Sequence, residues 1–217
     1  MSLTVACVRT GTRYGPEYVY RLREGVRRHL AAQHRFLCLT DAPDALLGVE
    51  TEDVSRHGLP GWWAKLALLD VASRSDSRVV FLDLDMVICG SLDPLAALEV
   101  EFGVCASFTK AAGNAAWPCR YGSCVMSFAP GFGADGWSRF MADRDSYIMR
   151  AGNHGDQMVF EWLYPAASLL QPLLPPGFFV GYRDLTDSMP EGCSVAVFAG
   201  KAKPHNCEFQ WIRNAWE

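Results

Sequence analysis

Two carboxylates stand one residue apart in the stretch RVVFLDLDMVICGSLDPL, which begins at Arg78. Residues 79–82 have the apolar pattern of a central parallel strand buried on both faces, and Asp83 and Asp85 occupy the next alternate positions. Side chains at i and i+2 leave a strand on the same side, so these two carboxylates are expected to lie close together. Such a pair resists burial unless one carboxylate takes up a proton or a cation lies between them. A divalent metal is the simplest cation, and the spacing therefore predicts a metal site.

Two other predicted strand ends carry polar residues. The stretch RTG at residues 9–11 follows the first strand, and GKAKPH at residues 200–205 follows the last. Glycine lets a backbone approach a ligand closely, lysine supplies a compact charge for phosphate, and histidine can bind a metal beside carboxylates. Singly, Lys203 also fits an exposed turn, and a lone histidine such as His205 is more often structural than a ligand. Because ligands of open α/β sheets gather beyond the carboxyl ends of the strands, the three ends together predict one binding site.

Strands and helices alternate along the chain, which is typical of a mainly parallel sheet covered by helices. The first helix opens at Pro16, and its apolar residues recur at helical spacing: Val19, Leu22, Val26 and Leu30. The other expected elements are strands at 3–8, 36–39, 79–82 and 194–198, two strands between 102 and 129, and helices at 62–72, near Trp137 and from Asp156. No repeat, low-complexity tract or linker interrupts this pattern, so residues 1–217 are predicted to form a single α/β domain.

The composition excludes several classes of protein. Half of the 217 residues are apolar, which is enough for one sizeable core. The formal charge of -4 gives no general attraction to nucleic acid or acidic membranes. The chain begins with a strand-like segment rather than a signal segment, and its apolar residues 166–180 are interrupted by a glutamine and three prolines. No transmembrane segment is expected.

The eight cysteines are predicted to be reduced. Five of them lie in or beside apolar runs, where a free cysteine packs as a small hydrophobic side chain: Cys7, Cys38, Cys89, Cys105 and Cys193. No CxxC pair occurs, and no other cysteine spacing completes a zinc site. Reduced thiols suit a reducing cytosol, so a cytoplasmic location is expected.

Several ordered blocks resemble a known enzyme family. DLD after an apolar strand, GDQ at residues 155–157 and VFAGKAKPH near the end are similar in order and spacing to the nucleotide-sugar glycosyltransferases of the GT-A fold. The likeness is to family 8, which includes glycogenin and bacterial lipopolysaccharide galactosyltransferases. Further blocks resemble a group of small bacterial proteins regarded as glycosyltransferases: CVRTGTRYGPEYVYRLREGVRRHL, FLCLTD, GWWAKLALLD, GSCVMSF and KPH. This likeness spans nearly the whole chain.

The resemblance implies a metal-dependent hexosyltransferase that moves a sugar from a nucleotide-diphosphate sugar, usually a UDP-sugar, to an unknown saccharide, lipid-linked or small-molecule acceptor. In this family the paired aspartates, here Asp83 and Asp85, bind Mn²⁺ or Mg²⁺ at the diphosphate. Lys203 and Gly200 match the glycine-lysine-proline block, whose lysine contacts phosphate. The metal and the lysine would stabilise the charge that develops on the departing diphosphate.

The first loop and one later block supply the expected nucleotide contacts. By position in that loop, Thr10, Gly11 and Tyr14 are expected to line the base and ribose pocket, and Tyr14 offers an aromatic face. Lys65 falls in the GWWAK block, where a phosphate or ribose contact and a surface helix position are both open.

One departure from family 8 concerns the metal. The family takes a third ligand from a histidine three residues before the glycine, and this chain has Val197 there. Valine cannot bind a metal. His205 lies in the same loop and is predicted to replace the missing ligand.

Asp156 and Gln157 match an Asp-Gln pair that lies near the reacting carbon of the sugar in family 8. The resemblance implies that Asp156 holds sugar hydroxyls or stabilises the transition state, and that Gln157 supplies a polar oxygen on the reacting face. Asp156 is also well placed to cap a helix start. Family analogy favours retention of the anomeric configuration.

Two alternatives stay open. The stretch VVFLDLDMV also fits the start of a haloacid-dehalogenase phosphatase, in which the first aspartate, Asp83, is phosphorylated and the second, Asp85, acts as acid and base with magnesium. That motif normally opens its domain, whereas some 80 residues precede it here. The other alternative is a nucleotide-sugar-binding protein that has lost catalysis, which Val197 suggests.

Overall fold

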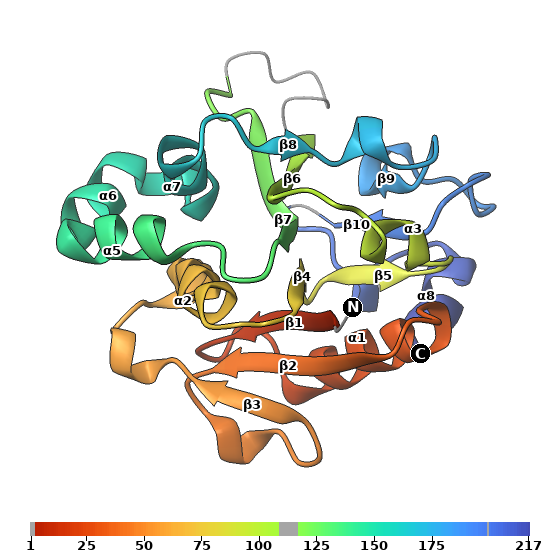
Figure 1. Ribbon diagram of the computed structural model, residues 1–217. Coiled ribbons are helices and arrows are strands. Elements are labelled where there is room, and N and C mark those ends of the chain that lie inside the picture. Colours follow the sequence, from red (N-terminus) through yellow and green to blue (C-terminus); the bar gives the residue numbers. More distant parts are fainter. Residues whose placement is uncertain (1–2, 109–116, 199) are drawn as a thin grey trace.

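The computed structural model describes residues 3–108, 117–198 and 200–217 (Figure 1). The strands of its central sheet are β1 (Leu3–Arg9), β2 (His34–Thr40), β3 (Glu50–Asp53), β4 (Arg78–Leu82), β6 (Phe102–Ala106), β7 (Tyr121–Phe128) and β8 (Ser168–Leu169). Within the described residues their order is β3-β2-β1-β4-β7-β6-β8. A smaller sheet contains β5 (Met86–Ile88), β10 (Val195–Val197) and β9 (Phe179–Gly181), in that order.

The central sheet is mostly parallel. The strands β3, β2, β1 and β4 run parallel to one another, and β8 runs parallel to β6. The exception is β7, which lies between β4 and β6 and is antiparallel to both. The expected α/β architecture with a mainly parallel sheet is therefore confirmed, and the antiparallel strand is a feature that the alternation of elements did not predict.

Helices cover both faces of this sheet. The described α-helices are α1 (Pro16–His29), α2 (Ala67–Ser73), α3 (Asp93–Ala96), α5 (Ala134–Ala142), α6 (Arg144–Ala151), α7 (Asp156–Leu163) and α8 (Gln210–Trp216). Helix α1 begins at Pro16 as predicted, because the fixed φ of proline suits the first helical position. The expected helix at 62–72 is instead a 3-10 segment, η3 (Gly61–Leu66), followed by α2. The helices expected near Trp137 and from Asp156 are α5 and α7.

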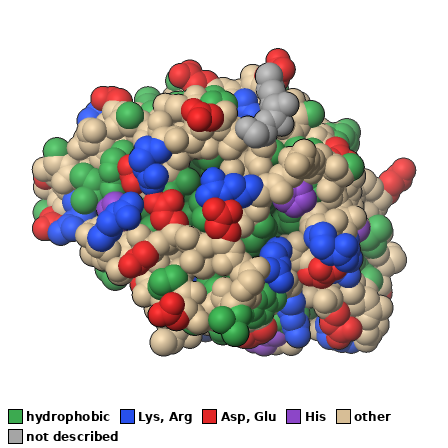
Figure 2. All heavy atoms as spheres, turned by 60° about the horizontal axis from the view of Figure 1, so that its bottom comes forward, with side chains coloured by type: hydrophobic (Ala, Val, Ile, Leu, Met, Phe, Trp, Pro, Cys, Tyr) green, Lys and Arg blue, Asp and Glu red, His purple; other side chains and the backbone are tan. Residues whose placement is uncertain are grey.

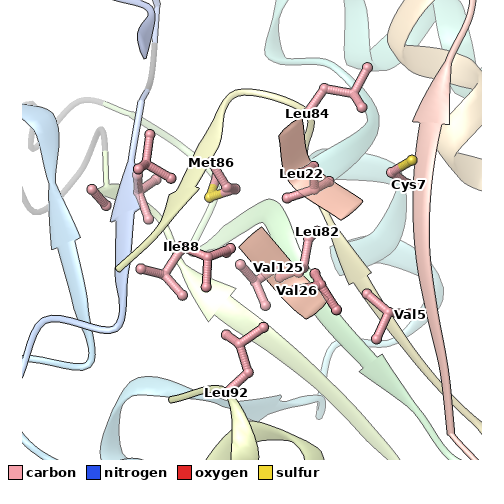
Figure 3. Packing of buried hydrophobic residues seen from close by; sticks show 14 of the residues in the cluster. Val5, Cys7, Leu22, Val26, Leu82, Leu84, Met86, Ile88, Leu92 and Val125 are labelled. Carbon is pink, nitrogen blue, oxygen red and sulfur yellow. The ribbon is translucent and has the colours of Figure 1, made fainter. Parts of the chain in front are cut away.

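Strand β4 separates two hydrophobic cores. Val80 and Leu82 belong to one core, and Val79 and Phe81 belong to the other. All four side chains are at most 3% exposed, so the expectation of a strand buried on both faces is confirmed. The first core contains side chains of β1, α1, the smaller sheet and α8, and the second contains side chains of η3, α2, α5 and α7. Figure 3 shows part of the first core, with Leu22 and Val26 of α1 pointing toward Leu82 and Val125.

The acidic pair lies in a turn rather than on a continuing strand. Strand β4 ends at Leu82, and the Met86 amide donates to the Asp83 carbonyl at 3.2 Å. The chain then enters β5, which pairs antiparallel with β10. This smaller sheet fixes the site from two sides, because Asp85 directly precedes β5 and the segment that leads to Lys203 follows β10.

The surface charges, the cysteines and the helix lengths can be compared with what the composition led us to expect. Figure 2 shows Lys and Arg side chains interspersed with Asp and Glu on one face of the molecule. None of the eight cysteines is joined in a disulfide in the structure, and their reduced state stays a prediction. Among residues 3–108, 117–198 and 200–217, no helix combines the length and the hydrophobicity needed to cross a bilayer.

Candidate active site

A cavity of about 520 Å³ opens where β1 and β4 end and β7 begins. It brings together nine of the eleven residues singled out from the sequence: Thr10, Tyr14, Lys65, Asp83, Asp85, Asp156, Gln157, Gly200 and Lys203. These residues come from five separate parts of the chain. The prediction that polar strand ends meet at one place is therefore confirmed.

Asp85 is held by two partners from opposite ends of the chain. The ammonium of Lys203 lies 2.5 Å from its Oδ2 atom, and the Tyr14 hydroxyl donates to the same oxygen at 2.9 Å. Lys203 and Asp85 are 9% and 6% exposed, so this ion pair is largely shielded from water. Burial, reinforced by the negative charge of Asp85, raises the pKa of Tyr14 above its usual range. Tyr14 therefore keeps its proton and its hydrogen bond at neutral pH.

Lys65 connects the other aspartates. Its ammonium lies 2.7 Å from Asp83 Oδ2 and 3.9 Å from Asp156 Oδ2. Burial by itself would lower the pKa of Lys65, but attraction by Asp156 and Asp83 raises it overall. Lys65 is thus a charged residue inside the site rather than a lysine on an exposed helix surface.

The cluster contains more negative than positive groups. Three carboxylates, from Asp83, Asp85 and Asp156, face two ammonium groups, from Lys65 and Lys203. Burial raises the pKa of Asp83 to about 7 despite the opposing effect of Lys65. A proton or a bound cation would relieve the excess negative charge at this position.

Asp156 is the first residue of α7, and it does not cap that helix. The N-cap position is Gly155, and no side-chain hydrogen bond caps the helix start. Gly155 has φ +78° and ψ -167°, a conformation that is essentially restricted to glycine. Asp156 is 5% exposed, and its Oδ2 atom has no hydrogen-bond partner. The capping interpretation is therefore wrong, and the carboxylate lies beside the Lys65 ammonium, 3.9 Å from Oδ2.

Two of the predicted site residues do not line the cavity. The first is Gly11, whose amide donates to Asp41 Oδ2 at 2.8 Å. The second is His205, an exposed residue of the 3-10 segment η7 (Pro204–Asn206). Its Nδ1 atom is hydrogen-bonded to the Tyr18 hydroxyl, and its ring lies 6.4 Å from that of Trp216. The structure thus places His205 in an aromatic cluster with α1 and α8 rather than with Asp83 and Asp85.

Comparison with known proteins places this arrangement in a fold family. No family model matches the chain, and no curated protein matches it in sequence. A solved structure of galactosyltransferase LgtC, in complex with donor and acceptor sugar analogues, covers 97% of this chain and 93% of its own, with TM-score 0.68 and 15% identity. Glycosyltransferase GlyE of Streptococcus pneumoniae matches with TM-score 0.67 and 14% identity over 98% of this chain and 60% of its own. The bifunctional glycosyltransferase WbbM matches with TM-score 0.64 and 13% identity over 99% of this chain and 49% of its own. The chain has the GT-A fold of glycosyltransferases.

The GT-A fold disfavours the phosphatase alternative. The phosphatase motif would occupy the first strand of its domain, whereas Asp83 follows β4, after three strands of the same sheet. The matched structures are glycosyltransferases. The resemblance seen in the sequence blocks is therefore supported at the level of the fold.

Enzymes of the GT-A fold typically use a divalent metal, and the acidic pair can provide part of such a site. Within the described residues, no group of three His, Cys, Asp or Glu side chains converges as a complete ligand set. The position of the family histidine is taken by Val197, which lines the cavity and is 2% exposed. Two carboxylates nevertheless suit Mg²⁺ or Mn²⁺, since these ions are commonly held by one or two carboxylates together with substrate phosphates. Asp83 and Asp85 fit a metal of that kind.

Sequence reasoning missed several residues that line the GT-A cavity. These are Arg13, Trp62, Trp117, Ser123, Asn153 and His154, among others. Trp62 belongs to the same GWWAK block as Lys65, so the block could have identified Trp62 as a candidate site residue. Trp117 and His154 could not be paired from the sequence, because 37 positions separate them and only the fold brings their rings to 4.9 Å.

Proposed function

We propose that this protein is a metal-dependent glycosyltransferase that transfers a hexose from a UDP-sugar to an acceptor, with retention of the anomeric configuration. The observation that carries the proposal is the convergence of Asp83, Asp85 and Asp156 with Lys65 and Lys203 in one cavity of a GT-A fold. The cavity holds both the acidic residues that suit a cation and the lysines that suit a diphosphate. LgtC, which matches nearly the whole chain, was solved with donor and acceptor sugar analogues.

The nucleotide end of the donor is proposed to lie against the loop after β1. Tyr14 presents a half-buried ring there, and its hydroxyl is fixed by Asp85. Thr10 lines the same wall, and its hydroxyl donates to the Gly61 carbonyl at 3.0 Å. Gly200 also lines the cavity, where the absence of a side chain lets the backbone approach a phosphate. Gly11 is proposed to act indirectly, since its amide binds Asp41 and orders the same loop.

The diphosphate is proposed to lie beside the ion pair of Lys203 and Asp85. A divalent cation bound by Asp83 and Asp85 would offset the negative charge that develops on the diphosphate as the sugar–phosphate bond breaks. Lys203 supplies a second positive charge, and its burial keeps that charge in a region of low dielectric where it acts strongly. Lys65 lies 2.7 Å from Asp83 and 3.9 Å from Asp156, and its positive charge holds the two carboxyl groups near each other.

The transferred sugar is proposed to lie near the start of α7. Asp156 Oδ2 lacks a hydrogen-bond partner in the described structure and can accept from a sugar hydroxyl. Gln157 lines the cavity one residue further on and supplies a polar oxygen. The stereochemical outcome is tested by NMR of the product linkage: a retained configuration supports this assignment, and an inverted one contradicts it.

A thermal-shift experiment tests the donor and the metal together. UDP with Mn²⁺ at about 100 times the dissociation constant should stabilise the fold by about 2.7 kcal/mol, which corresponds to roughly 5–10 °C for a chain of this size. UDP with EDTA should give a much smaller shift, and the double variant D83N/D85N should lose the effect of Mn²⁺. No shift with any nucleoside diphosphate would contradict the proposed function.

The metal role of His205 stays a prediction with its own test. Calorimetry of Mn²⁺ binding to the UDP-loaded protein compares the wild type with His205→Ala. Weaker binding supports a direct role for His205, whereas unchanged affinity leaves Asp83 and Asp85 as the ligands from the protein. A cytoplasmic location likewise stays a prediction.

A nucleotide-sugar-binding protein without catalysis is the second candidate, and Val197 is the observation that favours it. Valine at this position removes one metal ligand of the family pattern, which could weaken turnover more than binding. Incubation with a panel of nucleotide sugars and Mn²⁺, followed by measurement of released nucleotide, separates the two candidates. Binding without hydrolysis or transfer across the panel supports the second.

A further inference from the structure

Two cysteines far apart in the sequence meet at the edge of the smaller sheet. Cys89 directly follows β5, and Cys193 lies two residues before β10. Their Sγ atoms are 3.5 Å apart, although 104 positions separate the two residues. Neither residue lines the cavity, so the proposed transferase reaction does not use this pair.

The backbone holds the two thiols in this position. The amides of Cys89 and Gly90 both donate to the Ser194 carbonyl, at 2.9 and 3.2 Å. Gly90 also fits closely against the segment before β10, because a Cβ atom there would lie 2.9 Å from the Cys193 carbonyl oxygen. A disulfide needs an S–S distance of about 2.05 Å, so the sulfur atoms must come closer than their present 3.5 Å for the bond to form.

Cys89 is one of two partly exposed cysteines, with Cys124, and its partner Cys193 is buried. The cysteines fully buried in the cores include Cys7, Cys38 and Cys105. The hydrogen bond from Cys89 lowers the pKa of Cys193, and the same contact together with burial raises the pKa of Cys89, so Cys193 is the first of the two to give up its proton. One thiol that ionises readily, Cys193, in contact with one that solvent reaches, Cys89, provides the two groups that thiol–disulfide exchange needs.

We propose that Cys89 and Cys193 form a reversible redox modification site that reacts with small-molecule disulfides of the glutathione type. In the first step, a thiolate of the pair attacks the small disulfide, forms a mixed disulfide and releases one small thiol. The second cysteine then loses its proton, attacks the mixed disulfide and releases the other small thiol. Overall, two protein thiols are oxidised to one disulfide, and one small disulfide is reduced to two thiols.

The disulfide would join the two strands that flank the active site. Strand β5 begins next to Asp85, and β10 leads toward Lys203, so the new bond ties together the segments that carry this ion pair. It would also close a loop of about 100 residues, and long closed loops restrict the unfolded chain most strongly. The oxidised protein should therefore unfold at a higher temperature than the reduced protein.

Equilibration in glutathione buffers tests the site. After incubation with oxidised glutathione, free thiols are alkylated and peptides are identified by mass spectrometry. We expect one disulfide-linked peptide pair that contains Cys89 and Cys193, and a rise in the unfolding midpoint of about 5 °C or more. Dithiothreitol should reverse both effects. Cys89→Ser and Cys193→Ser should abolish them, while Cys207→Ser, which removes a buried cysteine outside this pair, should leave them intact.

Two results would overturn the proposal. One is full alkylation of both cysteines after equilibration with oxidised glutathione, and the other is a stable glutathione adduct on Cys89 alone. If Cys193→Ser folds poorly because that thiol is buried, Cys89→Ser and peptide mapping of the wild type still decide the question. This test uses no donor or metal, so its outcome is independent of the proposed transferase function.

Discussion

Lys203 is the residue on which the charge balance of the site depends most directly. Its ammonium and the Asp85 carboxylate are both largely buried, and removal of one partner leaves the other charge without compensation. We expect Lys203→Met to lower the free energy of unfolding by about 3 kcal/mol. The measurement is urea denaturation monitored by tryptophan fluorescence.

Two controls separate the loss of the ion pair from the loss of packing. The double variant K203M/D85N removes the unpaired charge and should recover part of the stability. Arg139→Met breaks an exposed ion pair with Asp135 and should cost less than about 1 kcal/mol. Equal losses in Lys203→Met and the double variant would show that packing, not charge, determines the effect.

The sequence indicated most of these residues individually but not their pairing. Asp83 and Asp85 could be recognised because two carboxylates after an apolar strand demand compensation. The compensating groups could not be recognised in the same way, because Lys65 is 18 positions from Asp83 and Lys203 is 118 positions from Asp85. Lysine on a short helical segment is usually exposed, and only the tertiary fold reveals that Lys65 is not.

At the scale of elements, the start of α7 depends on Gly155. Its backbone conformation strains any residue with a Cβ atom, although the space around it is open except for Trp62 at 3.5 Å. We expect Gly155→Ala to destabilise the protein by about 1–3 kcal/mol and to weaken donor binding, because Asp156 would move with the helix start. Calorimetry with UDP-sugars measures the second effect.

A matched variant distinguishes strain from displacement of Asp156. Gly11 also has a positive φ, +64°, with no atom near its missing Cβ, but it does not line the cavity. Gly11→Ala should therefore destabilise the fold with a smaller change in the affinity for the sugar part of the donor. If both variants bind UDP-sugars as the wild type does, the position of Asp156 does not depend on Gly155.

Elements with strong local patterns were predictable, and those held by distant partners were not. Helix α1 has proline at its start and a regular apolar face, and β4 is apolar throughout, so both were recognised. The strands β5 and β9 are three residues long, and they exist only because both pair with β10, which follows β5 by about 100 residues. No short stretch of the sequence contains that information. The smaller sheet directs the acidic pair toward the cavity.

On the scale of the whole molecule, both cores share the central sheet. Strands β1 and β4 contribute side chains to each core. Loss of one core would therefore expose one face of the strands whose other face supports the second core. The described residues are therefore expected to unfold in one cooperative transition, in agreement with the predicted single domain. Far-UV circular dichroism and tryptophan fluorescence should give the same urea midpoint, and two separate midpoints would contradict this expectation.

The C-terminal helix should take part in the same transition. Trp216 of α8 is 6% exposed, and it packs between the Tyr18 ring at 5.1 Å and the Arg21 guanidinium at 3.9 Å, both on α1. Trp216→Ala should lower the free energy of unfolding by about 3–5 kcal/mol and shift the whole denaturation curve, because it opens a cavity in the first core. The exposed Trp62 provides the control, and its alanine variant should shift the curve much less. If Trp216→Ala leaves the circular dichroism midpoint unchanged, α8 is an appendage that melts independently of the core.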